Sequence, residues 1–255
     1  MLTPEEVAQY HETGQVTSAF RLDLDVISAI EEKMEALFAE RTDFEELDLA
    51  DSLVEIDRSW IEFARIPEIL DCVEQLLGEN LIVWAVECFR KKGKSSKAVP
   101  WHQDGCYWPM RPLESCTVWI ALDHVTPENG CMRIIPGSHK ERRLSTHVIT
   151  EGDHVNLRQT VAADEMPDTV PVDVVLEPGM MSFHDVYTVH GSAPNNSGSR
   201  RAGLTIRYMP SSSYYDRKLA VEIGGSPKNA VHELHLVRGI DECGRNDLYQ
   251  PELAS

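Results

Sequence analysis

From residue 81 to residue 210 the chain repeats one pattern, in which short runs of β-branched and aromatic residues alternate with turn residues. Such runs are typical of strands, and the segments between them, including TPENG, EPG and NNSGS, are rich in the residues that turns favour. Closely spaced strands joined in this way favour an antiparallel barrel or jelly roll. The runs are LIVWAVECF, CTVWIALDHV, CMRIIPGS, VPVDVVLEPGMMSFHD and AGLTIRYMP.

The residues before about position 78 carry a helical pattern instead. Thr3, Pro4 and Glu6 supply an N-cap, a first-turn proline and a capping-box acid for a short helix that should run toward Gly14. Apolar residues at helical spacing predict further helices in DLDVISAIEEKMEALFAE and in IPEILDCVEQLLGEN, the second ending at an αL cap on Gly78. We therefore expect a mainly β chain with flanking helices (α+β), the N-terminal helices packing on a jelly roll.

The length of 255 residues suits one domain. We expect a helical N-terminal part over about 1–78, a jelly-roll core over about 80–210 and a C-terminal extension over 211–255. The polar, irregular stretch from about 140 to 170 is predicted to be an insertion between strands, where a lid or substrate loop could lie.

Charge and cysteine usage exclude several classes of partner. A formal net charge of -18 would repel a phosphate backbone, so the expected partner is a small molecule and not nucleic acid. The six cysteines form no C-x-x-C pair, which argues against a structural zinc site or a disulfide framework and favours a reducing, cytoplasmic location. No basic and apolar leader and no run of 18 apolar residues occur, so neither export nor a membrane span is expected.

The stretch WHQDGCYWPM carries the first candidate site. In an extended segment His102 and Asp104 would share one face and offer two metal ligands at chelating spacing. With ten histidines in the chain, an H-x-D pair by itself favours a structural role. A third ligand is required, and His190 is the best candidate, since two histidines and one carboxylate suit non-haem Fe(II). His184 with Asp185 is a rival pair that spacing does not exclude.

Several ordered segments resemble the phytanoyl-CoA dioxygenase family of Fe(II)- and 2-oxoglutarate-dependent oxygenases. They are WHQDGCYWPMRP, VWIALDHVTPENGCMRIIPGSHK and EPGMMSFHD followed by HGSAPNNSGSRRAGLTIRY. Residues 10–16 are similar to the family's N-terminal helix and turn, and the similarity otherwise covers about residues 80–210. The resemblance implies a double-stranded β-helix of the cupin-like type, and O₂ and 2-oxoglutarate as cosubstrates of a bound Fe(II).

The resemblance also assigns roles to individual residues. It makes His102, Asp104 and His190 the iron ligands, and the presence of Asp104 favours oxygen transfer over halogenation. It gives the distal carboxylate of 2-oxoglutarate to an arginine eleven residues after His190, where Arg201 stands, with Arg200 as the competitor. Further cosubstrate contacts implied in this way are Trp119, for which core packing is the alternative, Ser192, and one of the neighbours Lys91 and Lys92, of which Lys92 is chosen.

The substrate side is less determined. Tyr107, Trp108 and Arg111 follow the H-x-D pair and are expected to line it, and Arg207 could share a face with Arg201 and serve substrate or structure. The basic segment FRKKGKSSK could attract an anion, although solvated lysines on a hairpin are the plainer interpretation. Acyl-CoA, amino acid and phosphonate substrates all stay open.

The function expected from these residues is hydroxylation of an unactivated C–H bond of a small metabolite, which could be anionic, with release of succinate and CO₂. One alternative is a sensor or carrier that binds 2-oxoglutarate or metal without turnover. Another is a zinc or manganese hydrolase on a cupin-like barrel, which would not need Arg201. The sequence leaves the oligomeric state open.

Overall fold

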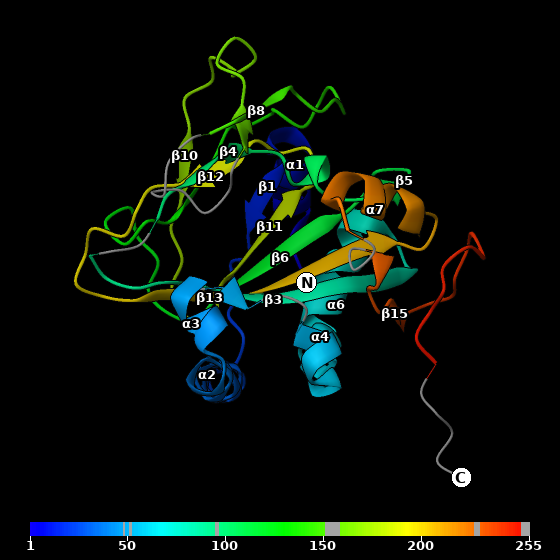
Figure 1. Ribbon diagram of the computed structural model, residues 1–255, viewed down its shortest axis with the longest axis horizontal. Helices are drawn as coiled ribbons and strands as arrows, with labels where there is room; N and C mark the ends of the chain where they lie inside the picture. Colours follow the sequence, from blue (N-terminus) through cyan, green and yellow to red (C-terminus); the bar gives the residue numbers. More distant parts are fainter. Residues whose placement is uncertain (48, 51–52, 95–96, 151–158, 227–229, 251–255) are drawn as a thin grey trace.

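The computed structural model describes residues 1–47, 49–50, 53–94, 97–150, 159–226 and 230–250. Its main element is a seven-stranded antiparallel sheet with strand order β1-β11-β6-β13-β3-β15, in which β2 also pairs with β3. The strands are β1 (Gln15–Thr17), β2 (Leu49–Ala50), β3 (Leu81–Lys91), β6 (Cys116–Ala121), β11 (Met181–Asp185), β13 (Arg201–Pro210) and β15 (His235–Arg238). The long strands β3 and β13 pair along their whole length (Figure 1).

A second, four-stranded antiparallel sheet has the order β10-β7-β12-β4. Its strands are β4 (Val99–His102), β7 (Met132–Ile134), β10 (Val172–Val174) and β12 (His190–Ser192). Two short pairs complete the strands, β5 (Met110–Arg111) with β14 (Tyr214–Tyr215) and β8 (His147–Ile149) with β9 (Gln159–Val161). This mainly antiparallel architecture with flanking helices confirms the predicted fold class.

In the part of the chain that the structure describes, the helices precede β3, with one exception near the C-terminus. They are α1 (Pro4–Thr13), α2 (Leu24–Glu40), α3 (Thr42–Leu47), α4 (Leu53–Ile56), α5 (Ile61–Ala64), α6 (Pro67–Leu77) and α7 (Arg217–Gly224), with 3-10 turns η1 (Arg58–Trp60) and η2 (Asp104–Cys106). The capping box of α1 is formed as predicted, by Thr3 and Glu6. The αL cap predicted at Gly78 is wrong, because the φ of 93° is positive but the ψ of 177° is extended.

The main core lies between the helices and one face of the large sheet. Figure 1 shows α2 and α4 on the opposite side of this sheet from β4, β10 and β12. The buried stripe of α2, Ile27, Ile30, Met34 and Phe38, belongs to one apolar cluster with sheet residues such as Val118 and Ile206. Each such side chain contributes about 1.5–3 kcal/mol when buried. Because the helices cover this face, the other face can carry polar side chains toward the small sheet.

The predicted insertion at about 140–170 contains the β8–β9 pair, while residues 151–158 lie outside the described part of the chain. The C-terminal extension contributes β15 to the edge of the large sheet beside β3. Among the described residues, none of the helices combines the length and the apolar character that a membrane crossing requires.

Candidate metal centre

His102 and His190 lie opposite each other on neighbouring strands. His102 is the last residue of β4 and His190 the first of β12, and their Cα atoms are register partners. Their ring centroids are 4.2 Å apart, and both residues are buried. The pairing of two short strands thus joins two histidines that are far apart in sequence.

Asp104 reaches the same place in a different way from the one predicted. The strand does not continue through it, because β4 ends at His102 and Asp104 is the first residue of η2. Gln103 between them is still extended, with φ of -114° and ψ of 126°. The alternation expected for a strand therefore survives across this residue, and the carboxylate returns to the side of His102.

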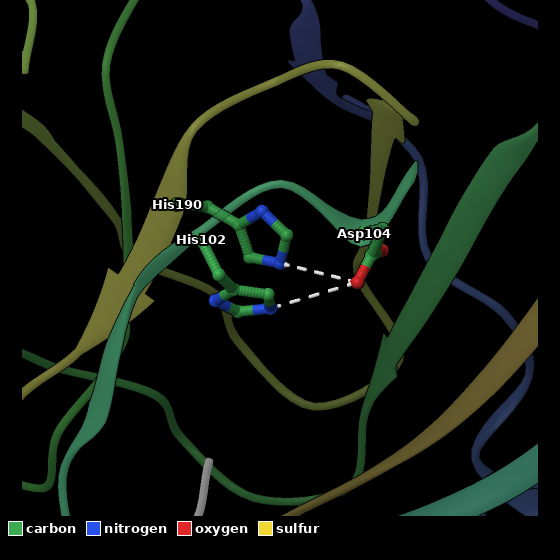
Figure 2. A group of neighbouring side chains, drawn as sticks. All are labelled: His102, Asp104 and His190. Atoms are coloured by element: carbon green, nitrogen blue, oxygen red, sulfur yellow. Dashed lines mark ion pairs between the residues drawn. The ribbon is translucent and has the colours of Figure 1, made fainter. Parts of the chain in front are cut away.

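The three side chains present ligand atoms to one another. Nε2 of His102 lies 3.5 Å and Nε2 of His190 lies 3.8 Å from the same oxygen, Oδ1 of Asp104, as Figure 2 shows. One ligand atom from each residue lies within 4.8 Å of the others, and this is the one such group of three found among the described residues.

The hydrogen bonds of both rings fix which nitrogen carries a proton. Nδ1 of His102 lies 2.9 Å from the carbonyl of Pro100, and Nδ1 of His190 lies 2.9 Å from the carbonyl of Thr188. A carbonyl only accepts, so each Nδ1–H donates and each Nε2 of a neutral ring offers a lone pair. Burial, followed by His102, holds the pKa of His190 well below its usual value, which keeps that ring neutral. Lone pairs of two nitrogens and a carboxylate oxygen that converge in a buried site fit a divalent cation.

The rival pair at positions 184 and 185 does not form a separate centre. Nε2 of His184 lies 3.3 Å from Oδ2 of Asp104, the oxygen that does not face Nε2 of His102 and His190, and its ring centroid is 4.7 Å from that of His190. Asp185 accepts hydrogen bonds from Arg142 Nη1 and from the backbone N–H of Tyr187. His184 is therefore a neighbour of the three-residue cluster, while Asp185 is committed elsewhere.

A second feature of the site is a pair of buried cations next to this cluster. Arg201 and Lys91 are cross-strand partners on β13 and β3. Arg201 donates from Nε and Nη2 to the carbonyl of Gly130, and Lys91 donates from Nζ to Ser192 Oγ (2.7 Å) and to the carbonyl of Ala193. Ser192 is two residues after His190 on β12, so the two share a face.

Neither cation has an acidic hydrogen-bond partner among the described residues. Burial, followed by the charge of Arg201, lowers the pKa of Lys91 to about 7. Burial likewise lowers the pKa of Arg201 to about 10. Two adjacent buried positive charges with only neutral partners form a site that an anion would stabilise.

The structure separates the alternatives that the sequence left open here. Arg200 points to an acidic cluster of Asp123, Glu31 and Glu35, so Arg201 is the arginine of this site. Lys91 is the buried lysine, whereas Lys92, which the sequence favoured, is half-buried and follows the end of β3. The strand register pairs Lys91, and not Lys92, with Arg201, so Lys91 is the lysine beside this arginine.

Trp119 flanks the arginine, with the guanidinium carbon of Arg201 at 5.2 Å from the ring centroid. Both residues line a small cavity together with Val125, Met132, Val174 and Leu176. Trp119 is half-buried, so it packs in the core and borders the cavity at the same time.

Of the residues predicted for the substrate side, Tyr107 lies beside His102 and Trp108 beside Arg207, whereas Arg111 is exposed. Tyr107 lies with its ring centroid 6.2 Å from that of His102, and its hydroxyl is buried without a partner among the described residues. Trp108 is buried with its ring centroid 4.4 Å from the guanidinium carbon of Arg207. Arg111 is exposed and donates to the carbonyl of Met110.

Arg207 is occupied by two acids of the protein itself. It donates from Nε to Glu87 (2.7 Å) and from Nη1 to Oδ2 of Asp104 (3.1 Å). Glu87 was not predicted from the sequence, and neither was Thr117, which donates to the same carboxylate of Asp104. The signal that could have found them is the even spacing of polar residues within apolar strands, Glu87 with Lys91 and Thr117 with Trp119.

Several known proteins resemble this chain in sequence or in fold. The sequence model of the phytanoyl-CoA dioxygenase (PhyH) family matches residues 1–203. A probable alpha-ketoglutarate-dependent hypophosphite dioxygenase of Stutzerimonas stutzeri is 31% identical over 151 residues, covering 59% of this chain and 52% of that protein. The peroxisomal phytanoyl-CoA dioxygenase of Bos taurus is 29% identical over 164 residues, covering 62% and 48%.

The chain therefore spans about half the length of the curated relatives it matches. Among solved structures, a non-haem monooxygenase, ThoJ in its apo form, has a TM-score of 0.72 and 25% sequence identity. That likeness covers 96% of this chain and 88% of the other.

Proposed function

Because the chain belongs to the phytanoyl-CoA dioxygenase family, we propose that it is an Fe(II)- and 2-oxoglutarate-dependent dioxygenase. The reaction that we propose is hydroxylation of an unactivated C–H bond of a small metabolite, with release of succinate and CO₂. The observation that carries the proposal is the convergence of His102, Asp104 and His190 on one point. Similarity to a protein described as alpha-ketoglutarate-dependent supports the choice of cosubstrate.

His102, Asp104 and His190 would hold the iron through Nε2, Oδ1 and Nε2. A ferrous ion bound there would supply the activation of O₂ and the oxidising power for C–H cleavage. The carbonyls of Pro100 and Thr188 accept from Nδ1 of the two imidazoles and so orient Nε2 of each ring toward Asp104. All three side chains are buried, which keeps bulk water from the reacting atoms.

Arg201 and Lys91 would bind the distal carboxylate of 2-oxoglutarate. Nη1 of Arg201 has no hydrogen-bond partner among the described residues, so the guanidinium keeps a donor for a carboxylate. Lys91 adds a second charge from the neighbouring strand, and the ring of Trp119 lies beside the guanidinium. Ser192 connects this anion site to the strand that carries His190.

The experiment is a succinate assay on protein loaded with Fe(II) under anaerobic conditions and then exposed to oxygen. Wild type should form succinate from 2-oxoglutarate even without substrate, and His102→Ala should abolish this. Arg201→Ala should weaken 2-oxoglutarate binding by about 10- to 100-fold, because a charge-assisted contact to a buried carboxylate is lost. Arg200→Ala removes the neighbouring arginine outside the site and should leave this affinity unchanged.

The same assay separates the alternatives. Binding of 2-oxoglutarate without any succinate would support a sensor or carrier. Hydrolysis supported by zinc or manganese, with no effect of Arg201→Ala, would support a hydrolase. A screen of acyl-CoA, amino acid and phosphonate compounds for faster succinate formation would address the substrate, for which Tyr107 and Trp108 are the proposed contacts.

We also propose that residues 1–255 act as one domain in the cytoplasm. In support of one domain, α1 and α6 contact the large sheet and β15 extends it. In support of a reducing compartment, all six cysteines are free thiols.

A further inference from the structure

The two carboxylate oxygens of Asp104 have different surroundings. Oδ1 faces the Nε2 atoms of His102 and His190. Oδ2 lies within hydrogen-bonding distance of three donors, Arg207 Nη1 (3.1 Å), Thr117 Oγ1 (3.3 Å) and His184 Nε2 (3.3 Å). The proposed metal position and the hydrogen-bond donors thus use different oxygens of one carboxylate.

The three donors form a single row across the large sheet. Arg207 on β13 is the register partner of Thr117 on β6, and Thr117 is the register partner of His184 on β11. Cross-strand partners point to the same face of a sheet, so all three side chains approach Oδ2 from one rigid surface. Asp104 lies in η2, which follows β4 of the small sheet, and the three donors approach it from the large sheet.

The guanidinium of Arg207 is itself fixed in place. Glu87 accepts from Nε and lies 2.6 Å from Nη2, both through its Oε2 atom. The ring of Trp108 lies on the guanidinium at 4.4 Å from its central carbon. Since Glu87 neutralises the charge, the pair adds a directed donor for Asp104 with little net charge.

We propose that Arg207 is a positioning residue that, with Thr117 and His184, holds Oδ2 of Asp104 so that Oδ1 alone coordinates the metal. This inference rests on the proposed function. A carboxylate can bind a metal through one or both oxygens. Binding through both would take a coordination position that the two-histidine, one-carboxylate arrangement leaves open for cosubstrate and oxygen. The hydrogen bonds from Arg207, Thr117 and His184 keep the carboxylate of Asp104 from rotating to bring Oδ2 to the metal. Arg207 therefore acts on a metal ligand and not on the substrate.

The decisive variant is the double substitution E87Q/R207Q, which removes the guanidinium while keeping the net charge of the pair. Co(II) serves as the probe, because its visible absorption reports coordination number and its binding can be titrated without turnover. We expect Co(II) to bind about 10- to 100-fold more weakly, the usual effect of removing partners of metal ligands. The absorption should shift toward a higher coordination number, and 2-oxoglutarate should bind the Co(II) form more weakly.

Two further variants keep the test informative if the double variant fails to fold. Thr117→Val removes one donor and leaves the ion pair intact, and should weaken Co(II) binding by about 2- to 10-fold with a smaller spectral shift. Arg238→Gln breaks a comparable pairing with Asp71 and Glu74 away from the site, and should change neither quantity.

The outcomes distinguish a failure of the positioning role of Arg207 from a failure of the proposed function. Unchanged Co(II) affinity and spectrum in folded E87Q/R207Q, or in Thr117→Val where the double variant is unfolded, would overturn the positioning role. A raised KM for substrate with an unchanged Co(II) spectrum would instead make Arg207 a substrate contact. If wild type binds no Co(II), or binds it equally after His102→Ala, the proposed function itself fails.

Discussion

Gly203 determines where Trp119 can lie. A Cβ atom at this position would be 2.2 Å from Cζ2 of the Trp119 indole, which cannot move without leaving Arg201. Gly203→Ala should therefore displace the indole, destabilise the fold by about 1–3 kcal/mol and weaken 2-oxoglutarate binding by about 10-fold. Chemical denaturation and titration of 2-oxoglutarate in the presence of Co(II) would measure the two effects.

Gly198 provides the matched control, because a Cβ there meets nothing within 4 Å and its backbone is not left-handed. Gly198→Ala should leave both stability and cosubstrate affinity as in wild type. Equal affinity in the Gly203→Ala and Gly198→Ala proteins would show that the position of the indole does not matter for the anion site.

Lys91 makes cosubstrate binding depend on pH. Its pKa in the free protein is lowered to about 7 by burial, followed by Arg201, so the amine is largely neutral above that pH. A bound dicarboxylate favours the charged amine and raises this pKa again, so binding takes up a proton above pH 7. The affinity for 2-oxoglutarate should fall as the pH rises from 7 to 8.5.

Calorimetric titration in two buffers of different ionisation enthalpy would count the protons taken up. In Lys91→Met the uptake should disappear and the affinity should become lower and flat with pH. The stability of the ligand-free protein depends on pH with the opposite sign to the affinity. The unfolded state holds more protons than the folded state between pH 7 and the usual value of 10.5, so this group makes stability rise with pH there.

At the scale of elements, the turn between α1 and β1 supports the strand that carries His190. The carbonyl of Gly14 accepts a hydrogen bond from Thr188 Oγ1 (2.8 Å), and the carbonyl of Thr188 accepts from Nδ1 of His190. Gly14 has a φ of +82°, and a Cβ on it would be 2.3 Å from Thr188 Oγ1. Gly14→Ala should lower stability by about 2–4 kcal/mol and also weaken Co(II) binding, because Thr188 must move.

Gly78→Ala shows the effect of backbone strain alone, without a contact like the one that Gly14→Ala makes with Thr188. Gly78 also has a positive φ, of +93°, but a Cβ there has open space. Its substitution should cost about 1–3 kcal/mol in denaturant unfolding and leave Co(II) affinity unchanged. If both alanine variants bound Co(II) like wild type, the connection from α1 to His190 would be refuted.

The elements that could be predicted were those whose sequence signal comes from residues close together in the chain. The period of apolar residues was sufficient for α2, and the capping box sufficed for α1. The polar helix α7 was not predicted, and residues around Asp104 were expected to be a strand because the 3-10 turn has no periodic signal. The choices between Arg200 and Arg201, and between Lys91 and Lys92, depended on sheet register, which pairs residues more than a hundred positions apart.

Contacts between distant residues also explain why the role of Arg207 was hidden. Its acidic partners, Glu87 and Asp104, precede it by 120 and 103 positions, and no local spacing links them. The sequence shows an arginine on a strand and cannot show that its charge is already neutralised. The cluster of His102, Asp104 and His190 was predictable because the first two are close in sequence and family motifs identify the third.

At the scale of the whole molecule, the site lies between the two sheets. His102 and His190 belong to the small sheet, while Arg201, Lys91 and Trp119 belong to the large one. With the helices covering the outer face of the large sheet, its inner face carries polar groups that are costly to bury without partners. Ligands that bind these groups should therefore stabilise the entire fold. The metal and 2-oxoglutarate should each make a contribution that can be measured separately.

Co(II) and 2-oxoglutarate should raise the melting temperature together. Ligand at 100 times its Kd stabilises by about 2.7 kcal/mol, which corresponds to roughly 5–10 °C for a chain of this size. Differential scanning fluorimetry should show a shift with Co(II) alone and a further shift when 2-oxoglutarate is added. His102→Ala should lose both shifts, since the cosubstrate needs the metal, whereas Arg201→Ala should keep the first and lose most of the second. A full second shift in Arg201→Ala would mean that the dicarboxylate is bound elsewhere, and the two-sheet account of the site would then be wrong.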